Sequence, residues 1–181
     1  FIVAEKLRKY DKLVDEFMSF IKHNRGTTPD IKTKAAEELA PFTAKIAKEL
    51  YETHGPIVVF SDHIKPTEII AKKLGVSPIN SKVNMKKRNA ILKEFQDGKS
   101  RYIVATIGTL STAISLVTSR CMIINDPPWV PGDLEQTERR IRRKGQTETC
   151  FYYKVLATPQ SEKIYKVLED KKQTLNKIDE L

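Results

Sequence analysis

The sequence predicts an α/β fold with a mainly parallel sheet flanked by helices, preceded by a helical extension. Short, wholly apolar runs alternate along the chain with segments whose apolar residues recur every three or four positions. The apolar runs show no alternation with polar residues, which is typical of strands covered on both faces. Strands that alternate with helices in this way indicate a parallel sheet rather than an all-α or all-β domain.

Residues 1–55 form the expected helical extension. Apolar spacings of three and four predict a first helix over residues 1–25. A second helical pattern runs from Ile31 to Leu50, and Pro41 should kink or split it. The apolar stripe of this helix pair has to be buried, either against the following domain or in a connector between two lobes.

Residues 56–181 form the expected domain. Its expected strands cover 57–60, 102–105, 122–124 and 151–156. Its expected helices cover 66–74, 82–95, about ten residues before Gly145, and a long segment from about 160 to 178. Gly75 and Gly98 are placed to close the first two of these helices.

The composition favours a polyanionic partner. Lys and Arg number 32 against 23 Asp and Glu, and the net charge is +9. Nucleic acid is therefore the first candidate, and an ordinary basic surface is the alternative. No apolar run approaches the roughly 18 residues of a membrane helix, so no membrane partner is expected. The two cysteines and three histidines lack metal-ligand spacing, so we expect reduced thiols and no metal site.

The chain begins with Phe1 rather than Met, and its first residues lack a signal-peptide pattern. We therefore expect a fragment of a longer intracellular protein. Such a protein would be cytoplasmic in a prokaryote or virus and nuclear in a eukaryote.

Polar residues directly follow three of the expected strands, at Ser61, Thr106 and Asp126. In open parallel sheets, ligands bind beyond the carboxyl ends of the strands. We therefore expect these three side chains to cluster at one edge of the sheet. The loop that leads into the arginine-rich helix, at the start of the segment 126–146, should lie at the same edge.

The segment 126–146 turns through prolines and then enters an expected helix. Asp133 should cap this helix at its start, with Gln136 returning the hydrogen bond. Gly145 should close it in the left-handed conformation.

Four arginines on so short a helix require an explanation. Helical phase places Gln136 on one stripe either with Arg140 and Arg143 or with Arg139 and Arg143, and does not choose between them. The arginines are either a solvated basic face or planar guanidinium groups that face phosphates.

The spacing within this segment carries a resemblance to a known family. The residues concerned are Gln136, Arg140, Arg143, Gly145 and Gln146, with the lead-in Pro128, Trp129, Val130 and Pro131. This pattern resembles the last conserved helicase motif of the Swi/Snf-type ATPases of superfamily two. The resemblance implies that residues 56–181 are a second RecA-like helicase lobe. It also implies that Arg143 is an arginine finger on the γ-phosphate of ATP and that Arg140 is its partner. Gln136 would orient the nucleotide or the motif, unless its capping role holds it.

A phosphate-binding glycine loop is absent from the sequence. No two of the seven glycines are spaced as GxxxxGK[ST] or GxGxxG requires. In phosphoryl transfer an arginine finger can come from a domain other than the one that holds the nucleotide. We therefore expect ATP and Mg²⁺ to be held mainly by a first RecA-like lobe of the parent chain. The fragment alone is expected to hydrolyse no ATP.

Two further stretches resemble superfamily-two motifs that contact the nucleic-acid backbone: the hydroxyl-rich loop of residues 100–116 and the strand that ends at Ser61. The expected backbone contacts are Ser61, Asp62, Thr106, Gly108, Thr109, Lys82 and Lys86. The alternatives are a polar capping loop and a solvated lysine face. On the helix between these stretches, Arg88 is expected to pair structurally and Phe95 to be core.

These observations predict the second motor lobe of an ATP-dependent DNA translocase or helicase, with duplex DNA favoured over single-stranded DNA. One alternative is a non-catalytic nucleic-acid-binding module whose basic charge is its whole function. Another is the lobe of an RNA helicase, since backbone contacts dominate recognition in both cases.

Overall fold

The computed structural model describes residues 2–3, 29–110, 114–128, 130–156, 166 and 170 of the chain. Within these residues the sheet has the order β1-β5-β4-β2-β3, and every neighbouring pair of strands is parallel. The strands are β1 (Ile2–Val3), β2 (Ile57–Ser61), β3 (Tyr102–Thr106), β4 (Cys121–Ile124) and β5 (Phe151–Leu156). The four strands expected in residues 56–181 are therefore confirmed.

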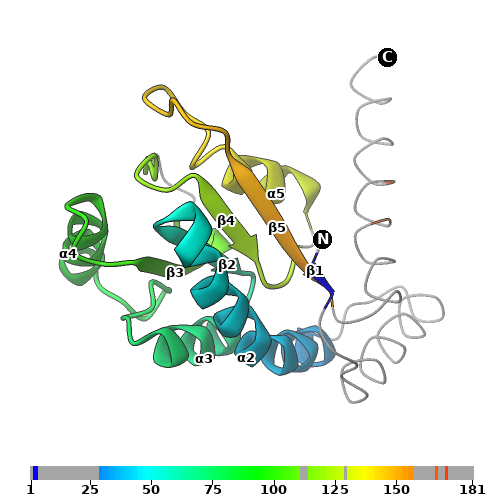
Figure 1. Cartoon of the computed structure of the whole chain (residues 1–181). Coiled ribbons are helices and arrows are strands. Elements are labelled where there is room, and N and C mark those ends of the chain that lie inside the picture. The colour runs from blue at the N-terminus through cyan, green and yellow to red at the C-terminus, as the bar shows by residue number, and fades with distance from the viewer. Residues whose placement is uncertain are drawn as a thin grey trace, which may run out of the picture.

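Helices cover both faces of this sheet (Figure 1). The helical elements are α2 (Pro29–His54), α3 (Ile64–Leu74), α4 (Met85–Gln96), the 3₁₀ helix η1 (Ile107–Leu110) and α5 (Pro131–Glu138). α3 ends at Gly75, whose φ of 71° is left-handed, and the side chain of Asn84 caps α4. None of the helices in the described ranges is both long and apolar enough to cross a membrane.

Successive residues of each strand point to opposite faces, and each face has its own apolar core. On one face the strands pack against α2 and α3 through Ile57, Val59, Val104, Ile123, Leu39 and Ile70. On the other they pack against α4 and α5 through Val58, Phe60, Ile103, Met122, Phe95 and Leu134. Both faces are buried, which explains why the strand sequences contain no alternating polar positions. The α/β prediction and the core position of Phe95 are confirmed.

α2 is a single helix that runs through Pro41, so the expected split does not occur. Pro41 is exposed and lacks the N–H that would bond the Glu37 carbonyl, yet the helix continues past it. Leu39, Ala40 and Ala47 are buried against the sheet. Of the two alternatives expected for this helix, the structure shows the first: its apolar stripe is buried against the following domain. A connecting role in a longer protein stays a prediction.

The first residues differ from the prediction. Residues 2–3 form β1, which pairs with β5, so the helix expected over residues 1–25 is wrong at its start. The open edge of β5, which only the assembled sheet creates, provides the partner for this strand. The rest of that helix lies outside the described residues. So does nearly all of the helix expected over 160–178, of which Lys166 and Asp170 are helical.

A buried polar network joins α2 to the end of β4. Asn125 is fully buried, and its Oδ1 accepts a hydrogen bond from the Thr43 hydroxyl at 2.6 Å. Its Nδ2 donates to the Ala36 carbonyl at 3.1 Å and to Asp126 Oδ1 at 2.9 Å. Because every polar atom of the Asn125 side chain is paired inside the protein, this residue fixes where α2 lies on the sheet.

We expect Asn125→Ala to lower the free energy of unfolding by about 2–3 kcal/mol, because buried polar groups on α2 and at Asp126 lose their partner. Urea unfolding of the variant and of Asn89→Ala, an exposed asparagine on α4, provides the comparison. The control should change by less than about 0.5 kcal/mol. Equal losses in the two variants would contradict the role of the network.

His54 ends α2 beside the start of β5. Its Nε2 lies 2.9 Å from the Tyr153 hydroxyl, and its ring packs on Phe151 with 4.4 Å between centroids. Its Nδ1 is buried and has no hydrogen-bond partner within the part of the chain that the structure describes. Burial, and then the charge of Arg120, lower the pKa of His54. The folded state therefore favours the neutral ring.

This pKa shift predicts a pH dependence of stability. The unfolded chain protonates His54 near the ordinary histidine pKa of about 6.5, whereas the folded chain does so at lower pH. The contribution of His54 is therefore complete above about pH 6.5 and is lost as pH falls through the lowered folded pKa. Urea unfolding at a series of pH values should show a smaller acid decline for His54→Phe than for the wild type. Parallel declines would rule out this effect.

Candidate functional site

The carboxyl ends of β2, β3 and β4 bring together the three polar residues predicted there. Ser61 lies opposite Thr106 in the register of β2 and β3, and its hydroxyl donates a hydrogen bond to Asp126 Oδ1. The predicted cluster at one edge of the sheet is therefore confirmed. Ser61 is fully buried, so in this lobe its hydroxyl serves Asp126 rather than an open surface.

Asp126 is the centre of this edge. Its Oδ2 lies 2.9 Å from His63 Nδ1 and accepts a hydrogen bond from the Asp62 backbone N–H at 3.2 Å. Burial alone would raise the pKa of Asp126, but the hydrogen bond and charge of His63, with the bonds from Ser61 and Asn125, hold it below its usual value. The carboxylate is therefore ionised at neutral pH and ties the loop after β2 to the loop after β4.

Asp62, His63 and Asp126 also place one potential metal ligand each within 4.8 Å of the others. The Asp62 carboxylate, however, lies 2.6 Å from Lys32 Nζ on α2, and Asp126 is bonded to His63. Protein donors thus occupy the positions that a divalent ion would need, so this group does not fit Mg²⁺. His63 and Lys32 did not stand out in the sequence, although His63 lies two residues after the end of β2.

The hydroxyl-rich loop continues from β3 as η1. The hydroxyls of Thr106 and Thr109 lie 2.6 Å apart, Thr109 is half-buried and Gly108 is exposed. Arg88 of α4 donates from Nη1 to the Thr109 carbonyl at 3.3 Å. The loop therefore stands beside α4 at the carboxyl edge. Its continuation at 111–113 lies outside the described residues.

Two predicted lysines lie near the start of α4, and both are exposed. Lys82 Nζ lies 2.9 Å from the Glu68 carboxylate. Lys86 is in the first turn of α4, which contains no acidic residue. An exposed ion pair such as Lys82–Glu68 contributes at most about 1 kcal/mol, so Lys82 can exchange this partner for a phosphate.

α5 begins earlier and ends earlier than predicted. It starts at Pro131 after Val130, which makes no side-chain cap, and it ends at Glu138. The predicted cap at Asp133 and the predicted closure at Gly145 are therefore wrong. Asp133 lies in the first turn, and Gly145 adopts its φ of 105° in the following loop. Pro131 sets the start because its fixed φ and missing N–H suit the first helical position.

The motif arginines consequently lie in turns beyond α5. The Arg140 carbonyl accepts a hydrogen bond from the Leu116 N–H at 3.0 Å, a tertiary contact in place of a helical one. Arg140 is only 6% exposed, whereas Arg143 is exposed. Burial, and then the charge of Arg143, lower the pKa of Arg140. The helical stripe predicted through Gln136, Arg140 and Arg143 therefore does not form.

Gln146 fastens the loop that carries these arginines. Its Nε2 donates to the carbonyls of Val117 at 3.2 Å and Ser119 at 3.0 Å, and its Oε1 accepts from the Glu148 N–H at 3.1 Å. Val117 and Ser119 precede the amino end of β4. The arginine loop thus lies away from the carboxyl edge, and only the start of the segment 126–146 reaches that edge.

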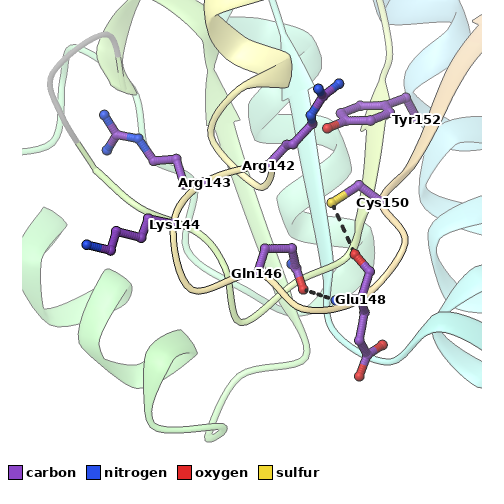
Figure 2. A pocket seen from close by; sticks show the side chains of 7 residues that line it. All are labelled: Arg142, Arg143, Lys144, Gln146, Glu148, Cys150 and Tyr152. Carbon is purple, nitrogen blue, oxygen red and sulfur yellow. Dashed lines mark hydrogen bonds between the residues drawn. The ribbon is translucent and has the colours of Figure 1, made fainter.

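The arginine loop and the start of β5 border a cavity of about 460 Å³ (Figure 2). Its lining residues are Arg142, Arg143, Lys144, Gln146, Glu148, Cys150 and Tyr152. Three of them are cationic, and Glu148 is an acid whose carboxylate lies 2.8 Å from Arg120. Figure 2 shows Arg142 beside the Tyr152 ring, with Arg143 and Lys144 extending to the other side. The balance of charge suits phosphate groups.

The parallel sheet and the arginine loop define a RecA-like lobe of the helicase class. The chain matches the helicase conserved C-terminal domain over residues 42–145 and belongs to this family. Within superfamily two it is of the Swi/Snf type, as the sequence motif implies and its relatives bear out.

Three relatives illustrate this placement. The DNA repair and recombination protein RAD54 of Saccharomyces cerevisiae is 23% identical over 136 residues, which cover 71% of this chain and 15% of the relative. The human DNA repair and recombination protein RAD54-like is 23% identical over 176 residues, 90% of this chain and 24% of the relative. The SNF2 domain-containing protein CLASSY 3 of Arabidopsis thaliana is 31% identical over 124 residues, which cover 61% of this chain and 9% of the relative. This chain thus spans less than a quarter of the length of each of these relatives.

Solved structures share the fold. The C-terminal part of the Fun30 ATPase domain has a TM-score of 0.60 at 16% identity, and the match covers 87% of this chain and 53% of that one. The C-terminal domain of the DEAD-box protein Dbp5 has a TM-score of 0.57 at 19% identity. That match covers 71% of this chain and 77% of the Dbp5 domain. At these identities the likeness establishes the fold alone.

We expect Gln146→Ala to loosen the arginine loop, because the Val117 and Ser119 carbonyls lose their donor. Each lost hydrogen bond contributes about 1 kcal/mol, so amide hydrogen exchange over residues 139–149 should quicken by about tenfold or more. Thr147→Ala changes the neighbouring exposed residue and should leave exchange unchanged. Similar exchange in the two variants would show that Gln146 does not hold the loop.

Proposed function

We propose that this chain is the second motor lobe of an ATP-dependent DNA translocase or helicase, and that it acts on ATP held by a first lobe of the same parent chain. The observation that carries this proposal is the cationic cavity at the arginine loop of a lobe whose sequence contains no P-loop. The much greater length of the relatives supports a further lobe in the parent.

In this proposal Arg143 is the arginine finger. It is exposed and lines the cavity with Arg142 and Lys144, where it can reach a phosphate that another lobe presents. Arg140 is buried next to it, so its role is to hold the loop and add positive potential. Gln136, exposed on α5, orients the nucleotide. Mg²⁺ is held by the first lobe, since Asp62, His63 and Asp126 have their ligand atoms occupied by protein donors.

Nucleic acid binds at the carboxyl edge in this proposal. Gly108 and Thr109 offer backbone and hydroxyl groups to phosphates, with Thr106 supporting Thr109 from the end of β3. Lys82, just before α4, and Lys86, in its first turn, extend the same surface, and the loop at Ser61 and Asp62 borders it. DNA is favoured over RNA because the relatives include DNA repair and recombination proteins. The duplex form is the one we propose from the resemblance of the arginine motif to Swi/Snf-type ATPases. The eukaryotic sources of these relatives support a nuclear location.

ATP turnover by the full-length parent tests this function. It should be measured without nucleic acid and then with duplex DNA, single-stranded DNA or RNA. Strong stimulation by duplex DNA is the expected result. Stimulation by RNA alone would favour an RNA helicase, and no turnover under any condition would favour a non-catalytic nucleic-acid-binding module.

We expect Arg143→Ala in the full-length parent to lower DNA-stimulated ATP turnover by about 10³–10⁵ while DNA binding is retained, because an arginine finger stabilises the transition state. Arg139→Ala is the matched control. Arg139 is exposed and forms an ion pair with Glu135 at 2.6 Å, so turnover should stay near the wild-type value. Turnover of Arg143→Ala within tenfold of the wild type would exclude the finger assignment.

A further inference from the structure

A second cavity lies at the amino end of β3, the last strand in the order of the described sheet. Its volume is about 360 Å³, at the lower end of the roughly 300–1,000 Å³ typical of ligand pockets. The hydroxyl loop follows the opposite, carboxyl end of the same strand. We call this cavity the β3 groove and define it by six of its lining residues, Leu74, Val76, Ile91, Glu94, Lys99 and Arg101.

The apolar wall of the β3 groove forms where the described sheet ends. Leu74 and Val76 pack against the core on the side of α2 and α3, whereas Ile91 packs against the core on the other face. All three are only half-buried, so both cores reach the surface at this edge. The bridge from Ile79 covers β3 at Ala105, near its carboxyl end. The apolar wall at the amino end therefore favours burial by an apolar side chain from another molecule.

The rim of the β3 groove is basic. Lys99 and Arg101 stand against a single lining carboxylate, that of Glu94, and all three side chains are exposed. Lys72 and Lys73 in the last turn of α3, directly before the groove wall, add two further exposed cations. Apolar walls with a basic rim match a ligand that combines an apolar group with carboxylates.

Two tyrosines position Arg101. Its guanidinium lies over the ring of Tyr51 on α2, 5.0 Å from the centroid, and the rings of Tyr51 and Tyr102 are 5.6 Å apart. Within the described ranges no ion pair includes Arg101, whereas Lys99 forms an exposed, easily exchanged pair with Asp97 at 3.6 Å. The cation–π contact holds the Arg101 side chain in place, which lowers the entropy cost of binding a carboxylate.

We propose that the β3 groove binds a short acidic segment of a partner protein. An apolar side chain of the segment enters the groove, and flanking Asp or Glu side chains contact Arg101 and Lys99. The apolar walls and the Glu94 carboxylate favour this ligand over nucleic acid, because a phosphate backbone is repelled by the carboxylate and gains nothing from the walls. This inference goes beyond the proposed function and does not depend on it.

Fluorescence anisotropy with labelled decapeptides and the full-length parent tests this assignment. One set of peptides carries a single Leu, Ile, Met, Phe or Trp between Asp and Glu residues. A second set has Lys and Arg in place of the acids, and a third has Ser in place of the apolar residue. At least one acidic apolar peptide should bind about tenfold more tightly than its basic and Ser counterparts.

Arg101→Glu should weaken binding of the best acidic peptide about tenfold and strengthen binding of its basic counterpart, because the charge at the rim is reversed. Glu94→Gln removes the lining carboxylate and should strengthen binding of the acidic peptide about twofold. Lys34→Glu is the matched control, since it reverses the charge of an exposed lysine of α2 that does not line the groove. It should leave both affinities unchanged. Thermal unfolding establishes that each variant is folded.

Three results would overturn the assignment. In the first, no acidic apolar peptide binds the wild type more tightly than its basic and Ser counterparts. In the second, Arg101→Glu equals Lys34→Glu in its affinity for both peptides. In the third, duplex DNA displaces the peptide and binds Arg101→Glu more weakly than Lys34→Glu, which would make the groove a nucleic-acid surface. None of these results involves ATP turnover, so the proposed function is tested separately.

Discussion

A single buried carboxylate holds the carboxyl edge of this lobe together. Asp126 accepts hydrogen bonds from Ser61 at the end of β2, from the Asp62 N–H and from His63, while Asn125 links the same point to α2. In a buried site each of these bonds is strong, and the loss of any partner is costly. The loops after β2 and β4 and the helix α2 are therefore held as one unit, on which the hydroxyl loop and the start of α5 are placed.

The segment after β3 joins the two regions that carry the proposed chemistry. It begins at the hydroxyls of Thr106 and Thr109, beside Arg88, and at Leu116 its backbone donates to the Arg140 carbonyl. A phosphate bound beside Thr109 and the arginine loop beside Leu116 would thus each contact a described part of the chain that follows β3.

The sequence predicted which residues form the candidate site better than it predicted how they are arranged. Ser61, Thr106 and Asp126 were identified as neighbours because parallel strands bring their carboxyl ends to one edge. The half-buried partners His63 and Lys32 could not be read from the sequence, since each depends on which loops and helices face one another. Arg140 and Arg143 were expected on one helical stripe, yet one is buried and the other exposed, because the chain leaves the helix at Glu138.

Local pattern was sufficient for the α/β class, the four strands of residues 56–181 and the helices α3 and α4, because burial on both faces or along one stripe is written directly into apolar periodicity. Tertiary contacts decided the rest. β1 forms because β5 offers an open edge, α2 stays continuous through Pro41 because its apolar face is buried on the sheet, and α5 stops where Leu116 and Gln146 bind the following turns. In each case hydrogen bonds or packing between residues distant in sequence outweigh the small differences in local conformational preference.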